Sequence, residues 1–395
     1  MDEIEWKQAQ RFESFFETQP FSLKESTYPT TVLVLTDEKG IYIGFINEQP
    51  WDTRYRRKTE RDAMWSDSDR NFFSIDFDGK ANTGYFFGVS LGGSMSDGSI
   101  DGDSQMDRDW DGDWEVKISE SETHWYSEFF LPWTVVPMMA DNQSSRSIGV
   151  YFSRQMMRVG KVIGFPGINY ERKNFLSRFH PITINQYKST KFVTFPYLVS
   201  SYDNLEDAAE YQAGLELFWS LGNGRELNMT INPDFGQVES DEVVINFSPI
   251  ETRLSDKRPF FSENQGLFKV SSGHGYNLIN TRRIGRSPDY NCDEYSVANG
   301  GSDDLQNSCE NQQKANNDID TALKFTQLGE HTDVGFFAAF EDDESFSKGR
   351  EFYAIRALRR LDQHKLGYLV THVERDALDR SATVHAFDYE NKATE

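Results

Sequence analysis

The chain has 395 residues, which exceeds what one hydrophobic core usually organises, so two or more domains are expected. Its mean hydropathy is -0.66 and 37% of its residues are hydrophobic, which excludes helical membrane spans of about 20 apolar residues and leaves strands as the only means of crossing a membrane. The formal net charge of -23 repels phosphate backbones, so nucleic acid is not an expected partner, whereas cations and neutral glycans are compatible with it.

Short strand-like runs separated by turn formers fill residues 30–195, and helical periodicity is nearly absent. The runs 31–35 and 41–46 flank an Asp-Glu-Lys-Gly turn, which predicts a β-hairpin. Further runs at this spacing lie at 72–77, 85–89, 114–118, 125–131 and 148–154. Many short strands with such turns predict an antiparallel β-sandwich.

An acidic stretch occupies residues 97–115, where seven Asp and one Glu stand among nineteen residues. Asp107, Asp109, Asp111 and Gly112 match the first half of a calcium-binding EF-hand loop, but position twelve is Ile118 and not Glu. Two interpretations stay open: a calcium site in an irregular loop built on Asp107, Asp109 and Asp111, or a solvated acidic loop. No other cofactor is expected.

Residues 215–231 alternate apolar and polar side chains on either side of a Gly-Asn-Gly turn at 222–224. This pattern predicts a hairpin with one apolar face and one mostly polar face. Such a hairpin fits both a soluble sandwich and a transmembrane barrel.

Cys292 and Cys309 are the only cysteines, and they lie in a polar stretch near 289–318 that is typical of a loop. The alternatives are a disulfide formed in an oxidising compartment and two free thiols in the cytosol. The spacing fits neither a CxxC redox motif nor a zinc knuckle, so the disulfide is favoured.

Five further strands are predicted after the cysteines, each close to the ten residues that a tilted strand needs to cross hydrocarbon. Arg356, Arg360 and His385 can face a polar interior, whereas Arg359 falls on the opposite face and would have to lie near an interface. The predicted strands span 319–328, 332–341, 351–361, 365–375 and 381–390.

Residues 230–268 and 282–288 carry a specific group of motifs. These are NPDF at 232–235, the ET pair at 251–252, DKRPFF at 256–261 and RRIGRSP at 282–288. With them the chain resembles the domain of unknown function 5916 family. The resemblance implies an all-β protein: an amino-terminal antiparallel β-sandwich similar to family 9 carbohydrate-binding modules, at residues 1–186, followed by part of an antiparallel transmembrane β-barrel at residues 187–395.

The likeness to family 9 modules rests on residues 31–47, 65–78 and 114–132. It places Trp65 where such modules stack a tryptophan on a terminal sugar, because an indole pairs with the apolar face of a pyranose. The expected ligand-binding residues are Trp65, Asp69, Trp51 and Trp110. The remaining tryptophans of this domain, Trp6, Trp114, Trp125 and Trp133, are expected to be mainly structural, and the second stacking tryptophan of the family has no counterpart after Trp133.

Glycoside hydrolysis would require a pair of carboxylates, and Glu239, Asp241, Glu242 and Glu251 are the candidates within the motif region. Basic residues nearby offer a charge-paired link between strands as the alternative. The sequence also lacks a GxSxG elbow, a Walker loop and an HExxH motif. An enzyme is therefore not favoured; if there is an activity, it would be hydrolysis of O-glycosyl bonds.

Together these observations predict an outer-membrane protein of a Gram-negative bacterium that binds or passes a glycan or related ligand without breaking bonds. Its expected partners are a carbohydrate and outer-membrane lipid. The alternatives are a glycan-degrading hydrolase of carbohydrate catabolism and a structural envelope adhesin. Residues 1–6 carry no apolar signal region, so an export signal is expected to have been removed.

Overall fold

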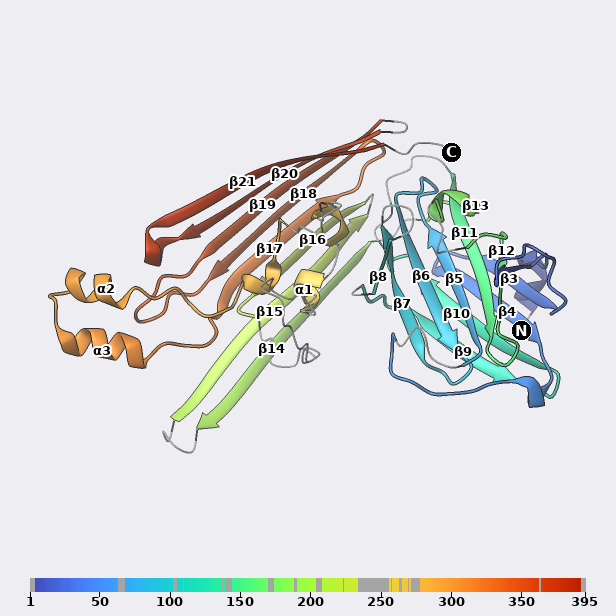
Figure 1. The fold of residues 1–395 in the computed structure, drawn as a ribbon, viewed down its shortest axis with the longest axis horizontal. Helices are drawn as coiled ribbons and strands as arrows, with labels where there is room; N and C mark the ends of the chain where they lie inside the picture. The colour runs from blue at the N-terminus through green and yellow to red at the C-terminus, as the bar shows by residue number, and fades with distance from the viewer. Residues whose placement is uncertain are drawn as a thin grey trace. The chain divides into compact units, whose positions relative to one another are not determined.

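The computed structural model divides into two compact units, Met1–Ser189 and Thr190–Glu395, and each is described by itself (Figure 1). It describes residues 4–391 except 63–67, 102–104, 109, 137, 139–143, 170–173, 188–189, 204–207, 223, 234–255, 257, 263–264, 269, 271–277 and 362–363. Among these described residues, no helix is long and apolar enough to cross a membrane.

The first unit is a sandwich of two antiparallel sheets, which confirms the predicted all-β class. The smaller sheet has the order β1 (Gln10–Phe12), β3 (Thr30–Thr36), β4 (Gly40–Glu48), β10 (His124–Pro132), β9 (Glu115–Glu120). The larger sheet has the order β2 (Phe16–Gln19), β12 (Lys161–Phe165), β11 (Ser145–Met156), β5 (Arg70–Asp76), β6 (Thr83–Ser90), β7 (Met95–Asp101), β8 (Gln105–Asp107), and β13 (His180–Asn185) also pairs with β11. Short 3₁₀ turns are η1 (Ile4–Gln8), η2 (Trp51–Thr53) and η3 (Leu176–Arg178).

The β3–β4 hairpin shows how local sequence sets this fold. The Asp37 carboxylate accepts hydrogen bonds from the backbone N–H groups of Lys39 (2.8 Å) and Gly40 (3.1 Å), which closes the turn. A side chain at Gly40 would lie 2.1 Å from the Leu131 carbonyl oxygen, so the turn can meet β10 only with glycine. The two strands predicted at 31–35 and 41–46 are confirmed as one hairpin.

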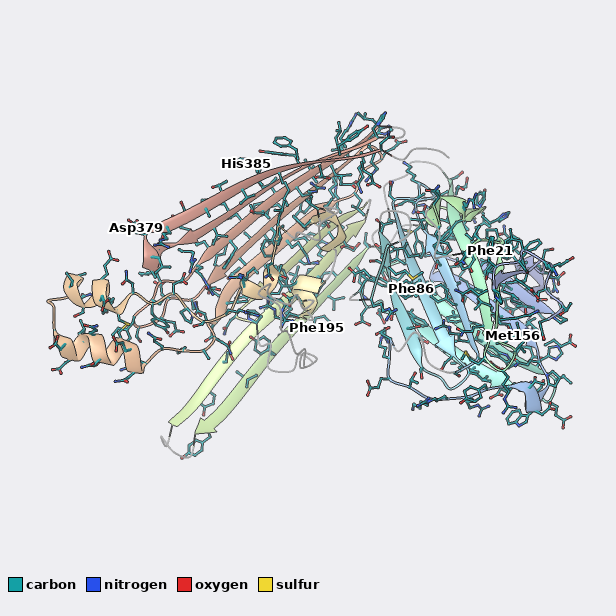
Figure 2. All side chains as sticks on the ribbon, in the orientation of Figure 1. Phe21, Phe86, Met156, Phe195, Asp379 and His385 are labelled. Atoms are coloured by element: carbon teal, nitrogen blue, oxygen red, sulfur yellow. A yellow bond between two sulfur atoms is a disulfide. The ribbon has the colours of Figure 1, made fainter. Side chains whose placement is uncertain are left out.

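Aromatic side chains from both sheets meet in the core of the sandwich. Phe73 lies edge-on to Phe129 with ring centroids 4.9 Å apart, and Phe45 packs 5.9 Å from the same ring. All three side chains are buried. A smaller cluster around Phe86, labelled in Figure 2, and Tyr151 lies apart from this core and includes Leu176 of η3.

The acidic stretch 97–115 departs from the expected loop, because β7 and β8 run into it. Asp97 sits opposite Phe87 of β6, and Asp107 pairs with Ser99. Composition misled the prediction here: strand pairing and buried hydrogen bonds offset the poor strand propensity of Asp and Gly.

The second unit contains one eight-stranded antiparallel sheet in which strands adjacent in sequence are neighbours in space. All five strands predicted after the cysteines are present, and the hairpin predicted at 215–231 is confirmed as β15–β16. The strands are β14 (Lys191–Asp203), β15 (Ala208–Gly222), β16 (Arg225–Ile231), β17 (Ile319–Gln327), β18 (Thr332–Glu341), β19 (Glu351–Leu361), β20 (His364–Arg375) and β21 (Arg380–Asn391). Short helices are α1 (Pro259–Ser262), η4 (Gln265–Phe268), η5 (Thr281–Arg283) and η6 (Asp376–Leu378).

A helical hairpin stands where the polar cysteine loop was expected. The helices α2 (Cys292–Ala298) and α3 (Asp303–Asn311) are joined by a disulfide between Cys292 and Cys309, so the expected disulfide is present but the expected loop is wrong. Asn291 caps α2 by accepting the Glu294 N–H, and acidic residues open both helices. These capping residues favour helix formation, although the polar composition of the segment had suggested a loop.

Candidate binding surfaces

An exposed tryptophan stands on the turn that follows β4 in the first unit. Trp51 begins η2 and is 57% exposed. The guanidinium carbons of Arg54 and Arg56 each lie 5.3 Å from the centroid of its ring, and the guanidinium carbon of Arg158 lies 6.0 Å from that of exposed Tyr55. We call Trp51, Arg54, Tyr55, Arg56 and Arg158 the Trp51 surface.

A buried polar network holds this turn in place. The Asp69 carboxylate accepts hydrogen bonds from Gln49 Nε2 (2.8 Å), the Tyr55 N–H (3.1 Å) and the Met157 N–H (2.8 Å). Arg54 donates through Nε and Nη2 to the Gln49 carbonyl oxygen at 2.9 and 2.7 Å. These buried hydrogen bonds hold the backbone of the turn, so the exposed rings of Trp51 and Tyr55 stand on a rigid segment.

Arg154 extends the network into the core of the sandwich. It donates to the Glu48 carbonyl and to Gln49 Oε1, both at 3.0 Å, and Trp125 Nε1 donates to the same Gln49 oxygen at 3.1 Å. Burial lowers the pKa of Arg154 to about 10, which still leaves it charged at neutral pH.

The predicted ligand-binding residues separate in the structure. Asp69 accepts a hydrogen bond from the Tyr55 N–H, on the turn that carries Trp51. Asp69 itself is fully buried, so it positions the turn and does not reach solvent. Trp110 packs against Tyr85 (4.7 Å) and Phe87 (5.9 Å) at the core. Trp65 lies outside the described residues.

Sequence reasoning missed Arg54, Tyr55, Arg56 and Arg158. A usable signal was present for the first three, since residues 54–58 read RYRRK in a chain of net charge -23. Arg158 joins the surface through the fold: its Nη1 donates to the Asp52 carbonyl oxygen at 2.6 Å. No local pattern could place it beside Tyr55.

The acidic stretch contributes to a cluster different from the predicted one. Asp62, Asp97 and Asp111 bring carboxylate oxygens within 4.8 Å of one another, whereas Asp107 is not part of this group and Asp109 lies outside the described residues. Burial raises the pKa of Asp97 to about 6, against the hydrogen bonds that it accepts from the Gly112 N–H (2.7 Å) and Trp114 Nε1 (3.0 Å).

These three carboxylates do not fit a calcium ion as they stand. Arg61 donates from Nη2 to Asp97 Oδ1 at 2.7 Å and from Nε to Asp111 Oδ1 at 2.9 Å. The guanidinium group therefore already supplies positive charge that a cation would bring, and it pairs with two of the three carboxylates.

The sheet of the second unit has two contrasting faces. One row of aligned residues crosses all eight strands: Phe192, Trp219, Leu227, Phe325, Phe336, Ile355, Val370 and His385. Ile355 in the middle of this row is 53% exposed, and Phe387 on the same face is 81% exposed. We call this side of the sheet the apolar face.

Charged residues on the apolar face lie at strand ends. Glu351 and Glu374 are paired at one end of β19 and β20, and Arg359 lies near the other end, where it donates to Thr332. This register places Arg359 on the face opposite Arg356 and Arg360, as expected. His385, labelled in Figure 2, aligns with Val370 on the apolar face, so its expected place beside Arg356 is wrong.

The opposite side, which we call the covered face, buries charged side chains under α1 and η4. Arg356 forms a two-point ion pair with Asp388 (2.5 and 2.9 Å) and donates through Nε to the Leu267 carbonyl oxygen at 3.1 Å. Lys324 Nζ donates to the Phe260 carbonyl oxygen at 2.6 Å. Arg360 pairs with Asp333, which keeps this charge on the covered face as well.

The motif residues anchor the segments that lie against the sheet. In the DKRPFF motif, Arg258 donates to both Asp256 oxygens (2.8 and 2.7 Å) and stacks 4.0 Å from the centroid of Phe261. Phe260 and Phe261 are buried. The motif is therefore held by its own Arg258–Asp256 ion pair, and its two phenylalanine rings pack against the covered face of the sheet.

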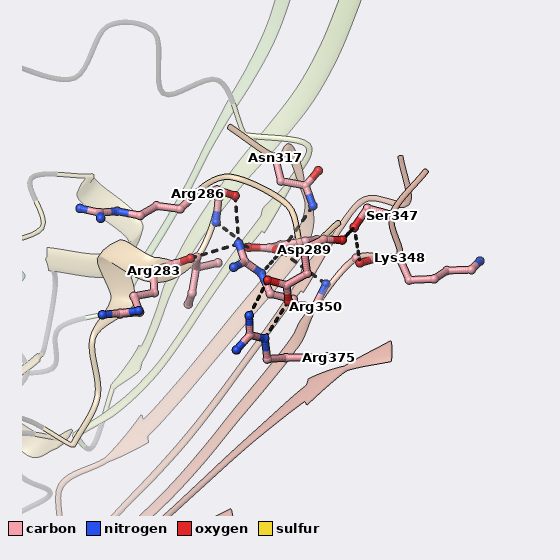
Figure 3. A network of polar contacts seen from close by, with 12 residues as sticks. Arg283, Arg286, Asp289, Asn317, Ser347, Lys348, Arg350 and Arg375 are labelled. Atoms are coloured by element: carbon pink, nitrogen blue, oxygen red, sulfur yellow. Dashed lines mark hydrogen bonds and ion pairs between the residues drawn. The ribbon is translucent and has the colours of Figure 1, made fainter. Parts of the chain in front are cut away.

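A second anchor fixes the RRIGRSP motif (Figure 3). Arg350 pairs with Glu341 (2.7 Å) and donates to the Arg286 carbonyl oxygen at 2.9 Å, while the Gly285 N–H donates to Glu341 at 2.8 Å. Asp289 pairs with Arg375 of β20. These contacts describe structural clamps; Glu239, Asp241, Glu242 and Glu251, the carboxylates considered for catalysis, lie outside the described residues.

Fold and surfaces together define a two-part antiparallel β protein, a sandwich followed by a sheet with one apolar and one covered face. Residues 189–348 match the family described as "Domain of unknown function (DUF5916)", which confirms the resemblance carried by the motifs. No curated protein matches the sequence.

Two solved structures are similar to part of the chain. One is described as a candidate carbohydrate-binding protein from Bacteroides uniformis ATCC 8492, with 10% identity, a TM-score of 0.35, and coverage of 45% of this chain and 87% of that one. The other is a family 9 carbohydrate-binding module from Caldicellulosiruptor kristjanssonii in complex with cellotriose, with 9% identity, a TM-score of 0.30, and coverage of 42% and 76%. At these scores, neither likeness bears on what this chain binds.

Proposed function

We propose that this chain is a non-catalytic outer-membrane protein: the apolar face of its second unit contacts lipid, and the Trp51 surface of its first unit binds a carbohydrate. The single observation that carries the proposal is the aligned row from Phe192 to Val370, which is apolar across seven neighbouring strands. A soluble sheet would cover such a row with a second layer.

The distribution of charge supports contact with lipid. Ile355 and Phe387 are exposed apolar side chains well inside their strands, and the charged side chains Glu351, Glu374 and Arg359 of the same face stand at or near strand ends, where headgroups and water would meet them. Lys324, Arg356 and Arg360 lie on the covered face, each with a partner. In this arrangement, hydrocarbon replaces the missing second layer.

Fluorescence quenching by brominated lipids tests the membrane part. Trp219 lies on the apolar face and is the only tryptophan after Trp133. The full chain reconstituted in vesicles of brominated phosphatidylcholine should lose part of its tryptophan emission, and Trp219→Phe should lose much less. A chain that stays in the aqueous fraction, with Trp219 unquenched, would refute lipid contact.

Carbohydrate binding at the Trp51 surface has a separate test. An exposed indole fixed by a buried network can stack on the apolar face of a sugar ring while nearby donors bind its hydroxyl groups. Glycan-array binding by the full chain in detergent should be lost in Trp51→Ala and kept in Trp219→Phe. Release of reducing sugar from a bound glycan would overturn the non-catalytic part.

A further inference from the structure

We infer that the Trp51 surface selects acidic saccharides, whose rings carry carboxylate or sulfate groups, over neutral ones. This inference rests on the carbohydrate binding proposed above and names the class of its ligand. The evidence is the gathering of three guanidinium groups around two exposed aromatic rings in a chain whose net charge is -23.

One carboxylate serves two guanidinium groups in this surface. Glu120 accepts from Arg54 Nη1 at 3.0 Å and from Arg56 Nη2. The side chain of Arg54 is almost fully buried by these contacts, whereas that of Arg56 remains 48% exposed. Arg54 is thus held within the fold between Glu120 and the buried charge of Asp69, whereas Arg56 keeps about half of its side chain in solvent, where its remaining N–H donors can reach a ligand.

Arg158 adds a second exposed donor at this turn. Its Nη1 donates to the neutral carbonyl oxygen of Asp52, and within the part of the chain that the structure describes it forms no ion pair. Two further carboxylates belong to this turn: that of Asp52 is exposed, and that of Asp69 is buried and favours the charged form of Arg54. The exposed guanidinium groups of the surface are therefore those of Arg56 and Arg158. Burial and the nearby charge of Arg56 lower the pKa of Arg54, as crowding of like charges requires.

This combination of groups matches an acidic sugar ring. Trp51 and Tyr55 offer flat apolar surfaces to a pyranose, and the planar guanidinium groups of Arg56 and Arg158 present paired N–H donors that fit carboxylate or sulfate oxygens. A neutral sugar would use the rings but leave the charge unmatched. A long nucleic acid would also meet arginine and aromatic rings, but the overall charge of -23 opposes a polyanion that extends beyond the surface.

The inference is tested by titration calorimetry of the full chain in detergent with three probes: tetragalacturonate, a chondroitin sulfate tetrasaccharide and cellotetraose. At least one of the two acidic probes should bind about tenfold more tightly than cellotetraose at low salt, and the advantage should shrink as sodium chloride screens it. The two acidic probes distinguish carboxylate from sulfate as the preferred group.

Variants separate charge recognition from folding and from ring stacking. Arg158→Gln should weaken the acidic probe by about fivefold and cellotetraose by clearly less, because a neutral hydroxyl loses one donor but no charge; Arg158→Lys should restore part of the loss of the acidic probe. Trp51→Ala should abolish binding of every probe. Lys39→Gln is the matched control, because Lys39 is an exposed cation at the opposite end of β4.

The outcomes distinguish the two proposals. Equal or tighter binding of cellotetraose, or no loss in Arg158→Gln, overturns acidic selectivity and leaves carbohydrate binding standing. Failure of all three saccharides to bind overturns the proposed carbohydrate function itself. Tighter binding of a thymidine oligonucleotide than of any saccharide would overturn both in favour of nucleic acid.

Discussion

In the first unit, Phe45, Phe73 and Phe129 lie on facing sheets and exclude water from one another, whereas Ile355 and Phe387 of the second unit stand on a single sheet and remain exposed. Both units are built from strands that alternate apolar and polar side chains. The two-residue alternation along a strand therefore specifies which side chains share a face of the sheet. Whether that face is shielded from water depends on whether a second layer packs on it. In the second unit, the buried layer covers the side that carries the charges.

The same Phe→Ala change in the two units gives the largest contrast. Phe73→Ala removes a ring that is packed against Phe87 and Phe129 and should cost about 3–5 kcal/mol of unfolding free energy. Phe387→Ala should change that free energy by less than about 0.5 kcal/mol in detergent, because its ring is 81% exposed. Urea titration of both variants measures this, and similar losses would erase the distinction between the units.

A charge placed on the apolar face sharpens the comparison further. Ile355→Arg should cost about 2–4 kcal/mol in a bilayer, because the residue lies near the middle of β19, far from either strand end. Ser119→Arg, on an exposed position of β9, is the matched control and should be neutral. Flotation of the reconstituted variants with vesicles reports the effect, and normal flotation of Ile355→Arg would contradict the assignment of this face to lipid.

The buried carboxylate of Asp97 predicts a pH dependence confined to the first unit. Burial raises its pKa in the folded state from 3.8 to about 6, so the folded state binds the proton more tightly than the unfolded state. This contribution to stability is complete below about pH 4 and is lost as the pH rises through about 6, by at most about 3 kcal/mol.

Asp97→Asn should remove that slope. Unfolding of the full chain, followed by tryptophan emission at pH 4 and pH 7, should show a smaller difference between the two pH values in the variant than in the unmodified chain. Equal differences in both proteins would mean that Asp97 titrates normally.

The smallest expected effect is that of calcium. Arg61 already pairs with Asp97 and Asp111, so chelation with EDTA should leave the melting temperature of the first unit unchanged. A rise of several degrees on adding millimolar calcium would show that Arg61 gives way to the ion.

How far sequence predicted this structure depends on how local the determining contacts are. The strands at 332–341 and 351–361 were predicted to their exact ends, because long alternating runs bounded by turn residues carry their own signal. The stretch 95–107 was not, since β7 and β8 depend on pairing with β6 and on the buried contacts of Asp97. The α2–α3 hairpin was also missed, although Asn291 is an ordinary capping residue.

For the candidate site, the sequence analysis named Trp51 but overlooked the basic run that follows it, and the geometry that joins both to Arg158 has no local signal. That contact brings together residues 106 positions apart in the chain, through the turn between β11 and β12. Asp69, expected to bind a ligand, is instead buried and accepts hydrogen bonds that hold the turn of Trp51. The role of a polar residue such as Asp69 depends on whether the fold buries its side chain, and residue type alone does not determine burial.

Three cations of the second unit donate hydrogen bonds to backbone carbonyl oxygens: Lys324 to that of residue 260, Arg356 to that of residue 267 and Arg350 to that of residue 286. Every amino acid carries a backbone carbonyl oxygen, so these hydrogen bonds do not require a particular side chain at the accepting position. Replacing Lys324, Arg356 or Arg350 should therefore remove its hydrogen bond, whereas a substitution at position 267 or 286 leaves the accepting carbonyl oxygen in place.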